Sequence, residues 1–190
     1  MTIEERRLRD RAAQRSLITS TARKLAEKEG WDAVTTRRLS AEIEYSQPVV
    51  YKHFASLDDL AEAVALEGFG ELAEALGRAR RAAPPETAAE AVARAYGAYA
   101  AENPSLYDVM FTRATRLRFG AEDTPAPLSA AYAELRAAVA TIVGKRDVDT
   151  LAEVLWAALH GLVMLDRTGR LRPGHQGERA EFLVDQLRAR

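Results

Sequence analysis

The 190-residue chain contains no cysteine. This absence excludes disulfides, cysteine-ligated zinc, iron–sulfur clusters and thiol nucleophiles, and it is typical of an intracellular protein. Long apolar runs are also missing, because the longest stretch without a charged side chain is the twelve residues 154–165. A helix that spans a membrane needs about 18 apolar residues, and the charged N-terminus has no signal-peptide core. The sequence therefore predicts a soluble, cytoplasmic protein with no membrane partner.

Catalytic and cofactor-binding motifs are absent as well. The three histidines, His53, His160 and His175, lie far apart and do not have the spacing of metal ligands. The chain has no Gly-rich phosphate loop, no Gly-x-Ser-x-Gly turn and no His-Glu-x-x-His pair. We therefore expect no catalytic residues, no metal site and no cofactor, and a small helical enzyme is the least favoured function.

Strand patterns are almost absent, whereas alanine is abundant and apolar residues recur every three or four positions. This pattern predicts an all-α protein of about nine helices. The first long helix ends at Gly30, which suits a C-terminal cap. Ser56 and Asp59 form the start signal of another long helix. Short helices are expected at 36–43 and 47–53, and later ones begin near residues 85, 104, 127, 147 and 176.

Charge is unevenly distributed along the chain. Residues 1–54 contain eleven Lys and Arg against eight Asp and Glu, a net charge of +3. Residues 55–190 contain sixteen against twenty, a net charge of −4. A basic end on a weakly acidic body indicates a polyanion as partner for that end. The first arginines of this end form either a solvated helix face or an N-terminal arm near DNA: Arg6, Arg7, Arg9 and Arg11.

The stretch 30–54 contains a helix, a three-residue turn at 44–46 and a second helix. Each helix spans about two turns, which is too short to persist alone in water, so packing must hold both. Four apolar side chains are available as anchors: Leu39, Ile43, Val50 and Phe54. This is the layout of a helix-turn-helix motif, whose second helix enters the major groove of DNA.

The second helix of this motif has side chains that suit DNA. Ser46 can cap it and Pro48 fixes its first turn, so its free amides can face phosphate. The face away from the anchors carries groups that bind base edges and phosphate oxygens: Gln47, Tyr51, Lys52 and His53. The alternative interpretation is an ordinary helical hairpin in which Tyr51 and His53 belong to the core, as Phe54 is expected to do.

At these residues the sequence resembles the TetR family of bacterial transcriptional repressors. The shared pattern is a helix that ends in Gly, then aromatic-x-x-x-Thr-Thr, an aliphatic residue at 39, Ser46 and Tyr-x-His-Phe at 51–54. Ser-Leu-Asp-Asp-Leu at 56–60 then opens the long helix, as in that family. The resemblance implies a three-helix DNA-binding domain at 12–72, with the helix-turn-helix at 35–54, and a C-terminal effector-binding and dimerisation domain at 73–190.

The resemblance also assigns DNA contacts to individual residues. Thr36 would contact phosphate, residues 45–49 would face bases and the nearby backbone, and residues 51–53 would grip phosphates. The DNA-binding set implied in this way is Thr36, Arg37, Tyr45, Ser46, Gln47, Pro48, Val49, Tyr51, Lys52 and His53.

Three positions depart from the family pattern. Glu44 stands where the family often has Gly, so it bears strain if its φ is positive. Pro48 replaces another common Gly, which changes how closely the backbone can approach DNA. Leu57 takes the place of a phosphate-binding Lys in many relatives, so we expect that contact to be missing.

The segment 151–165 is apolar except for Glu153 and His160. A helix that is apolar on all sides is buried on all sides, which in so small a protein requires a partner subunit. The last helix carries a matching apolar stripe of Phe182, Leu183 and Leu187. We therefore expect a homodimer through the last two helices of each subunit, around a two-fold axis. Its recognition helices would lie about one DNA turn, roughly 34–36 Å, apart on a near-palindromic operator.

Trp156, His160 and Gly161 resemble a C-terminal subtype of the family with a Trp…His-Gly segment, and the stretch 103–111 fits this subtype too. Family members bind a small effector between the middle helices of this domain, in a pocket that is mostly apolar. The candidates to line it are Tyr96, Tyr99, Leu106, Tyr107, Met110, Phe111, Trp156, His160 and Met164. Core packing is the alternative for each of them and the favoured one for His160. The few polar groups indicate an apolar or amphipathic effector.

Together these features favour a DNA-binding transcriptional regulator, a repressor that a small-molecule effector releases from its operator. A helical interaction protein that retains the motif without specific DNA binding is the alternative. The two differ in their salt dependence, because the affinity of a protein for DNA falls steeply as salt rises.

Overall fold

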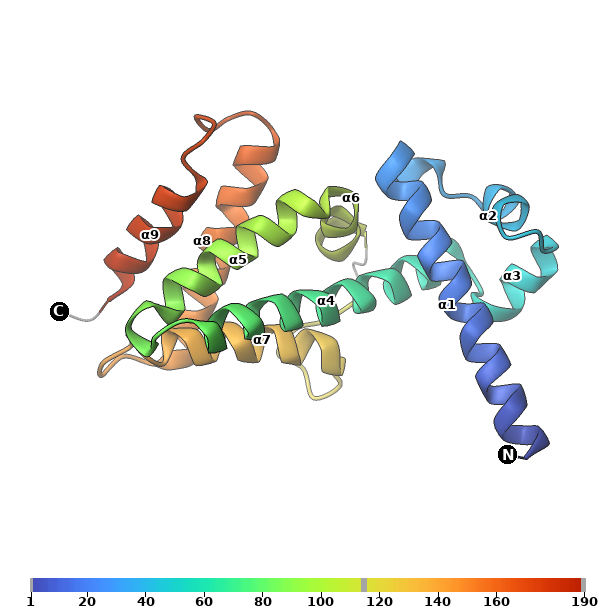
Figure 1. The fold of residues 1–190 in the computed structure, drawn as a ribbon, viewed down its shortest axis with the longest axis horizontal. Coiled ribbons are helices and arrows are strands. Elements are labelled where there is room, and N and C mark those ends of the chain that lie inside the picture. Colours follow the sequence, from blue (N-terminus) through green and yellow to red (C-terminus); the bar gives the residue numbers. More distant parts are fainter. Residues whose placement is uncertain (1, 114–115, 189–190) are drawn as a thin grey trace. The chain divides into compact units, whose positions relative to one another are not determined.

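The computed structural model describes residues 2–113 and 116–188, which form helices joined by loops, with no strand among them. The predicted all-α class is therefore confirmed. Two 3₁₀ turns, Trp31–Ala33 and Pro85–Thr87, and a π-helical turn, Val109–Arg113, accompany nine α-helices in this part of the chain. The α-helices (Figure 1) are α1 Ile3–Glu29, α2 Thr36–Glu42, α3 Gln47–His53, α4 Leu57–Ala82, α5 Ala88–Glu102, α6 Pro104–Asp108, α7 Ala126–Val139, α8 Val148–Arg167 and α9 Gln176–Leu187.

Several helix ends follow from the capping signals in the sequence. Gly30 ends α1 with a φ of 82°, and its N–H donates back into the last turn at 2.7 Å. At the start of α4, the Asp59 N–H donates to the Ser56 hydroxyl at 3.1 Å. At the start of α8, the Thr150 N–H donates to the Asp147 carboxylate at 2.7 Å. Each of these contacts satisfies a backbone group that a helix end leaves unpaired.

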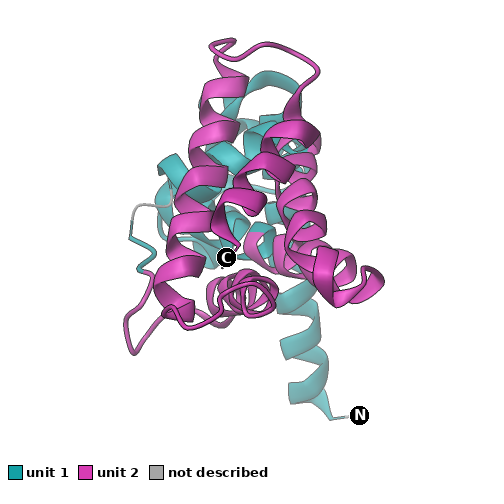
Figure 2. Ribbon diagram, turned by 90° about the vertical axis from the view of Figure 1, so that its left-hand side faces the viewer, with its two compact units in different colours: residues 1–68, 103–118 teal, residues 69–102, 119–190 magenta. Residues whose placement is uncertain are grey.

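The chain forms two compact units, which Figure 2 colours separately. Unit 1 consists of residues 1–68 and 103–118, and unit 2 consists of residues 69–102 and 119–190. The chain therefore passes between the units three times, once inside α4 and once at each end of residues 103–118, which we call the returning segment. The sequence ranges expected for the two domains assign the returning segment to the C-terminal part, whereas it packs with the N-terminal helices.

Contacts between residues far apart in sequence hold the returning segment in unit 1. The Glu27 carboxylate accepts hydrogen bonds from the N–H groups of Ser105, at 3.2 Å, and Leu106, at 2.9 Å. Glu27 on α1 therefore caps α6, although Asn103, a residue type that often caps helices, stands directly before it in the sequence. The Asn103 side chain makes no capping hydrogen bond and instead accepts one from Arg23 at 2.8 Å.

A glycine in α4 lets the returning segment approach closely. A Cβ built on Gly68 would lie 2.7 Å from Met110 Sδ and 3.0 Å from Leu106 Cδ1. Farther along, Arg116 forms an ion pair with Asp59 at 2.6 Å. Because this pair is largely exposed, it contributes little to stability, and the apolar contact around Gly68 contributes more.

The core of unit 1 forms around the four predicted anchors, which are all buried: Leu39, Ile43, Val50 and Phe54. Helix α1 contributes Ile18, Ala22 and Leu25 to this core, and α4 contributes Leu60 and Val64. The two short helices of the motif are thereby fixed by packing, as their length requires.

In unit 2, α5 packs against α7, α8 and α9, and α7 packs against α8. Helix α8 turns Leu151, Leu155 and Leu159 into this core, whereas Val154 and Leu165 are 47% and 40% exposed. By length and composition α8 would suffice to cross a membrane, and 22% of its most apolar 18-residue window is buried within the chain. The short uncharged run in the sequence therefore does not by itself exclude a spanning helix. Much of the apolar surface of α8 is left uncovered in a single chain.

Candidate nucleic-acid interface

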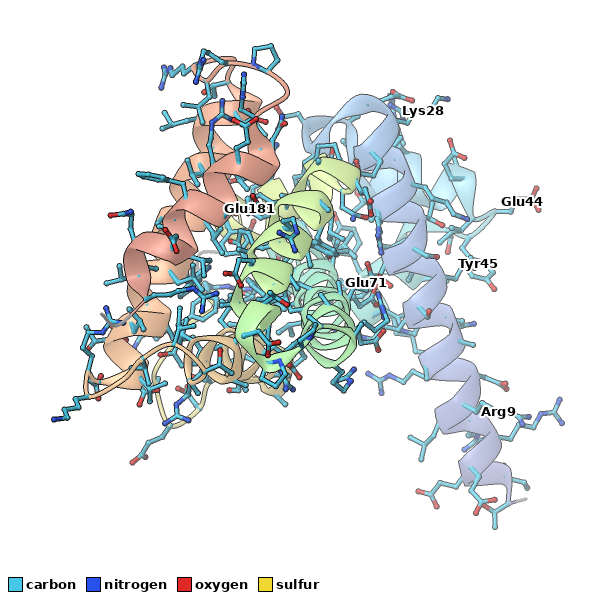
Figure 3. All side chains as sticks on the ribbon, turned by 60° about the vertical axis from the view of Figure 1, so that its left-hand side comes forward. Arg9, Lys28, Glu44, Tyr45, Glu71 and Glu181 are labelled. Carbon is cyan, nitrogen blue, oxygen red and sulfur yellow. The ribbon has the colours of Figure 1, made fainter. Side chains whose placement is uncertain are left out.

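A tight turn joins α2 and α3. Glu44 in this turn has a φ of 58°, and it is the residue other than glycine with a positive φ in the described ranges. The Tyr45 N–H donates to the Ser40 carbonyl oxygen at 3.0 Å, which closes the turn. The strain expected for a non-glycine residue at position 44 is therefore present, and such strain costs about 1 kcal/mol. Figure 3 shows the Glu44 and Tyr45 side chains projecting from the turn.

Most of the DNA-binding set lies on the surface of the motif. Tyr51 is 52% exposed and Tyr45 38% exposed. The other exposed members are Arg37, Ser46, Gln47, Pro48 and Lys52, and Thr36 and Val49 are half-buried. The hydroxyl of Ser46 accepts no capping hydrogen bond, which differs from the capping role expected for it. The turn and the outer face of α3 therefore present one continuous polar surface.

His53 is the exception, because it is 8% exposed and packs in unit 1. Its Nε2 lies 3.1 Å from Gln14 Oε1, and its Nδ1 is buried without a hydrogen-bond partner among the described residues. Burial lowers the pKa of His53, and the positive charges of Arg11, Lys52 and Arg15 lower it further. Gln14 of α1 lies against the ring, so His53 exposes far less of its side chain than Tyr51 does, and a phosphate contact by His53 stays a prediction.

The two arginines of α2 differ in whether their charge is already paired with a carboxylate. Arg38 forms a two-point ion pair with Glu29, at 2.5 and 2.8 Å, and this contact lowers the pKa of the Glu29 carboxyl. Arg37 beside it is exposed. The first turn of α4 carries Asp58 and Asp59 after Leu57, so no cation replaces the missing lysine there. The free positive charge of the motif therefore lies on α2 and α3.

Two side chains of α1 that sequence reasoning missed support the end of α3. The Arg15 guanidinium donates to the His53 carbonyl oxygen at 2.8 Å and lies 4.1 Å from the centroid of the Phe54 ring. Gln14 contacts the His53 ring from the same helix. The partners are 38 and 39 residues apart in sequence, so no local spacing could reveal them.

The residues expected to line an effector pocket fall into two groups. Leu106, Tyr107, Met110 and Phe111 belong to unit 1, and Tyr96, Tyr99, Trp156, His160 and Met164 belong to unit 2. Tyr96 and Tyr107 are fully buried, and Tyr99, Leu106 and Met110 are nearly so. His160 is half-buried, and burial lowers its pKa, followed by the positive charge of Arg167.

Unit 2 contains a hollow of about 520 Å³ beside Trp156. The ring of Phe119 lies 4.8 Å from that of Trp156, and Tyr132 and Glu153 line the same hollow. The Tyr132 hydroxyl donates to the Asp149 carbonyl oxygen at 3.2 Å, and burial raises the pKa of Tyr132. Of these residues, the sequence assigned only Trp156 to a pocket. Glu153 had a signal, since it interrupts an apolar segment.

No group of three or more His, Cys, Asp or Glu side chains able to hold a metal ion occurs within residues 2–113 and 116–188. The arrangement of unit 1 is instead that of a surface for a polyanion: exposed amide, phenol and cationic groups held on two short, well-packed helices.

Comparison with protein families gives two matches. The family described as "Bacterial regulatory proteins, tetR family" matches residues 18–64. The family described as "Tetracyclin repressor-like, C-terminal domain" matches residues 89–188.

Individual relatives agree with these matches. The chain is 29% identical over 160 residues to an uncharacterised HTH-type transcriptional regulator of Mycobacterium tuberculosis, with 82% of this chain and 71% of the relative covered. It is also similar to a solved structure of unknown function from Rhodococcus sp. RHA1, with 25% identity, a TM-score of 0.73 and coverage of 92% and 93%. The multidrug binding protein EbrR, solved with imidazole, shares the fold at 20% identity and a TM-score of 0.64, with coverage of 94% and 91%.

Proposed function

The chain belongs to the TetR family of bacterial transcriptional regulators, and we propose that it is a cytoplasmic repressor which a small-molecule effector releases from a near-palindromic operator. It is a regulator with a DNA-binding helix-turn-helix and not an enzyme. The observation that carries the proposal is the exposed polar face of α3. Gln47, Tyr51 and Lys52 are exposed on this face, and Val50 on the opposite side of the helix is buried in the core.

Each exposed group on this face has a matching chemistry on DNA. The Gln47 amide can donate and accept at once, which suits an adenine edge in the major groove. Lys52 and the Tyr51 hydroxyl suit phosphate oxygens, and Arg37 adds a positive charge from α2. Thr36, Tyr45, Ser46, Pro48 and Val49 surround these groups and would contact the backbone and bases at close range.

A second copy of the chain is the proposed partner of α8 and α9. Phe182 on α9 is 68% exposed, and Val154 and Leu165 of α8 are also uncovered. A groove between the two helices is lined by further small and apolar side chains, including Ala158, Gly161, Leu162 and Leu183. Burial of such a surface against itself favours a two-fold dimer. A dimer would present two α3 helices to two half-sites of one operator.

The C-terminal unit is the proposed effector-binding part. The hollow beside Trp156 has the size of a small-molecule site and combines aromatic walls with a carboxylate, Glu153. EbrR, a structural relative, was solved with imidazole. Among the described residues, Glu153 has no ion-pair partner, and with the aromatic faces it favours a positively charged, flat or bulky apolar ligand. Of the predicted residues, Trp156 lines this hollow, and we add Glu153 to it. Tyr96, Tyr99, His160 and Met164 stay candidates within the same unit.

Selection from random duplex DNA tests the DNA-binding part of the proposal. The purified protein should enrich a near-palindrome at moderate salt. On that duplex, Lys52→Gln and Gln47→Ala should weaken binding, and Gln47→Ala should also relax the base preference at one position per half-site. Lys145→Gln is the matched control, since Lys145 is an exposed lysine of unit 2. A folded protein that enriches no sequence would favour the helical interaction protein instead.

A pair of size-matched ions tests the effector part. In a Trp31→Phe variant, which leaves Trp156 as the one tryptophan, tetraphenylphosphonium should quench the tryptophan fluorescence and release the enriched duplex, whereas the anion tetraphenylborate should do neither. Glu153→Gln should weaken the effect of the cation, and Glu86→Gln should not, because Glu86 is an exposed glutamate that does not line this hollow. Equal responses to both ions would contradict the role of Glu153.

A further inference from the structure

The first turns of α1 have no packing partner. Every residue from Thr2 to Ala13 is exposed, and the first buried side chain of α1 is Ile18. In Figures 1 and 3 these turns extend beyond α3 without another element of unit 1 beside them. The family match begins at residue 18, so this part lies outside it. Helical segments of this length gain little stability in water without a binding partner. We call residues 3–15 the arginine arm.

Apolar residues on the arm do not form a docking stripe. Ile3 and Leu8 are 76% and 64% exposed. They are five residues apart, which places them on different sides of a helix with 3.6 residues per turn. An amphipathic helix that binds a groove or a lipid surface needs apolar residues on one side. The arm therefore does not suit a protein groove or a membrane.

Arginine is the residue that does form a stripe. Arg7, Arg11 and Arg15 are four residues apart and therefore share one face of α1. Arg7 and Arg11 have no carboxylate partner among the residues that the structure describes. The acidic residues of the arm are Glu4, Glu5 and Asp10. Asp10 faces Arg6 at 4.0 Å and Glu5 completes the capping box of the helix. Glu4 lies on the side of the stripe, but it forms no ion pair with Arg7 or Arg11 among the described residues.

This stripe runs up to the end of α3. Arg15 donates to the carbonyl oxygen of His53. Arg11 is also near enough to the His53 ring for its charge, with those of Lys52 and Arg15, to lower the pKa of that ring. The arginine face of the arm is therefore continuous with the proposed phosphate contact of Lys52.

From this continuity we infer that the arginine arm binds the phosphate backbone of DNA beyond the segment that α3 reads, with Arg7 and Arg11 as the contacts. The inference rests on the DNA binding proposed for α3 and adds a second, sequence-independent contact to it. Guanidinium groups pair well with phosphate oxygens. Phosphate contacts raise affinity for every sequence and leave the base preference unchanged.

The salt dependence of binding tests the inference. Each phosphate contact on B-DNA contributes about 0.9 to the slope of log K against log salt. The variant Arg7→Gln/Arg11→Gln removes two contacts per subunit, so a dimer should lose about 3 to 4 from the slope. The enriched sequence should stay the same. The variant should unfold at the wild-type temperature, because neither side chain is packed.

A matched control removes the same charge from unit 2. Lys145→Gln/Arg170→Gln changes two exposed residues of that unit and should keep the wild-type slope. A second readout compares duplexes that end at the recognised site with duplexes that continue beyond it. The longer duplex should bind the wild type more tightly, and the gain should disappear in the arm variant.

Two results can be told apart. If the wild type binds no duplex, the proposed function fails, and the arm fails with it. If the wild type binds and the arm variant has the same slope and the same response to longer flanks, the arm is a solvated helix end and the inference is overturned.

Discussion

The Arg15 guanidinium donates a 2.8 Å hydrogen bond to the carbonyl oxygen of His53, the last residue of α3. A positive charge at the C-terminal end of a helix also interacts favourably with the helix dipole. The same guanidinium stacks on Phe54, a buried anchor of the motif. One side chain therefore ties α1 to the end of the recognition helix, and its loss should be felt in both stability and DNA binding.

The variant Arg15→Gln should lower the free energy of unfolding by about 1–3 kcal/mol, because it removes a charge-assisted hydrogen bond and a cation–π contact. Urea denaturation measures this loss. Arg9→Gln is the control, since Arg9 lies on the exposed part of α1, and it should stay within about 0.5 kcal/mol of the wild type. Equal effects of the two substitutions would remove the structural role of Arg15.

The turn at Glu44 should respond to the shape of the side chain rather than to its charge. Asn tolerates a positive φ better than Glu, so Glu44→Asn should match or slightly exceed the wild type in stability. A β-branched residue does not tolerate it, so Glu44→Val should cost about 1–3 kcal/mol. Thermal unfolding of the two variants checks this order. A Val variant as stable as the Asn variant would mean that the turn has another conformation in solution.

Acid should destabilise the protein through His53. Its folded-state pKa lies below the ordinary value of 6.5, because burial and nearby cations disfavour the charged ring. The unfolded chain therefore binds the proton more readily, and the stability of the folded state falls as pH drops below 6.5. Half-buried His160 acts in the same direction. Urea denaturation across this pH range should show a shallower decline for His53→Gln, and an unchanged decline would contradict the burial of the ring.

Two glycines of α4 form a matched pair. A Cβ on Gly70 meets nothing within 4 Å, so Gly70→Ala should stabilise the helix by about 0.5–1 kcal/mol. A Cβ on Gly68 would lie 2.7 Å from Met110 Sδ and 3.0 Å from Leu106 Cδ1, so Gly68→Ala must shift these two buried side chains. It should therefore be less stable than the Gly70 variant by at least about 1 kcal/mol. Differential scanning calorimetry can compare them, and equal melting temperatures would show that the close approach is absent.

The proposed dimer can be broken at α9. Phe182→Glu places a charge on the uncovered apolar surface, so the chain should become monomeric in analytical ultracentrifugation. It should still fold, because Phe182 is 68% exposed within one chain. Binding to a two-half-site duplex should weaken strongly. Phe182→Leu keeps the surface apolar and should preserve the dimer, and a Glu variant that remains dimeric would place the interface elsewhere.

Local signals in the sequence were sufficient for much of the fold. The ends of α1 and α4 follow from Gly30 and Ser56, because a cap and its partner lie within a few residues. The four anchors of the motif were also predictable, since apolar spacing fixes which face of a short helix is buried. The resemblance drew attention to Glu44, because relatives often have Gly there, and the φ of 58° was left for the structure to show.

The remaining features depend on contacts between distant residues. His53 stands beside Lys52 in sequence, but Gln14 and Arg15 cover it, and only the folded chain brings them together. Glu27 caps α6 from a position 78 residues earlier, whereas a local pattern points to the adjacent Asn103. The predicted effector residues are mostly apolar or aromatic. Such side chains are buried in both units, so their type does not reveal which unit a residue belongs to.

The chain crosses between its two units three times, and this limits where the genes of two such regulators can be joined to make a hybrid protein. The part that carries the DNA-binding motif is assembled from two separate stretches, 1–68 and 103–118. A hybrid regulator made by a single crossover after α4 would combine one parent's motif with another parent's α6, and the contacts of Glu27 and Gly68 would be mismatched. Exchange of operator specificity between relatives would keep these contacts only if both stretches were inherited together. The genetic unit of specificity in this chain is therefore discontinuous.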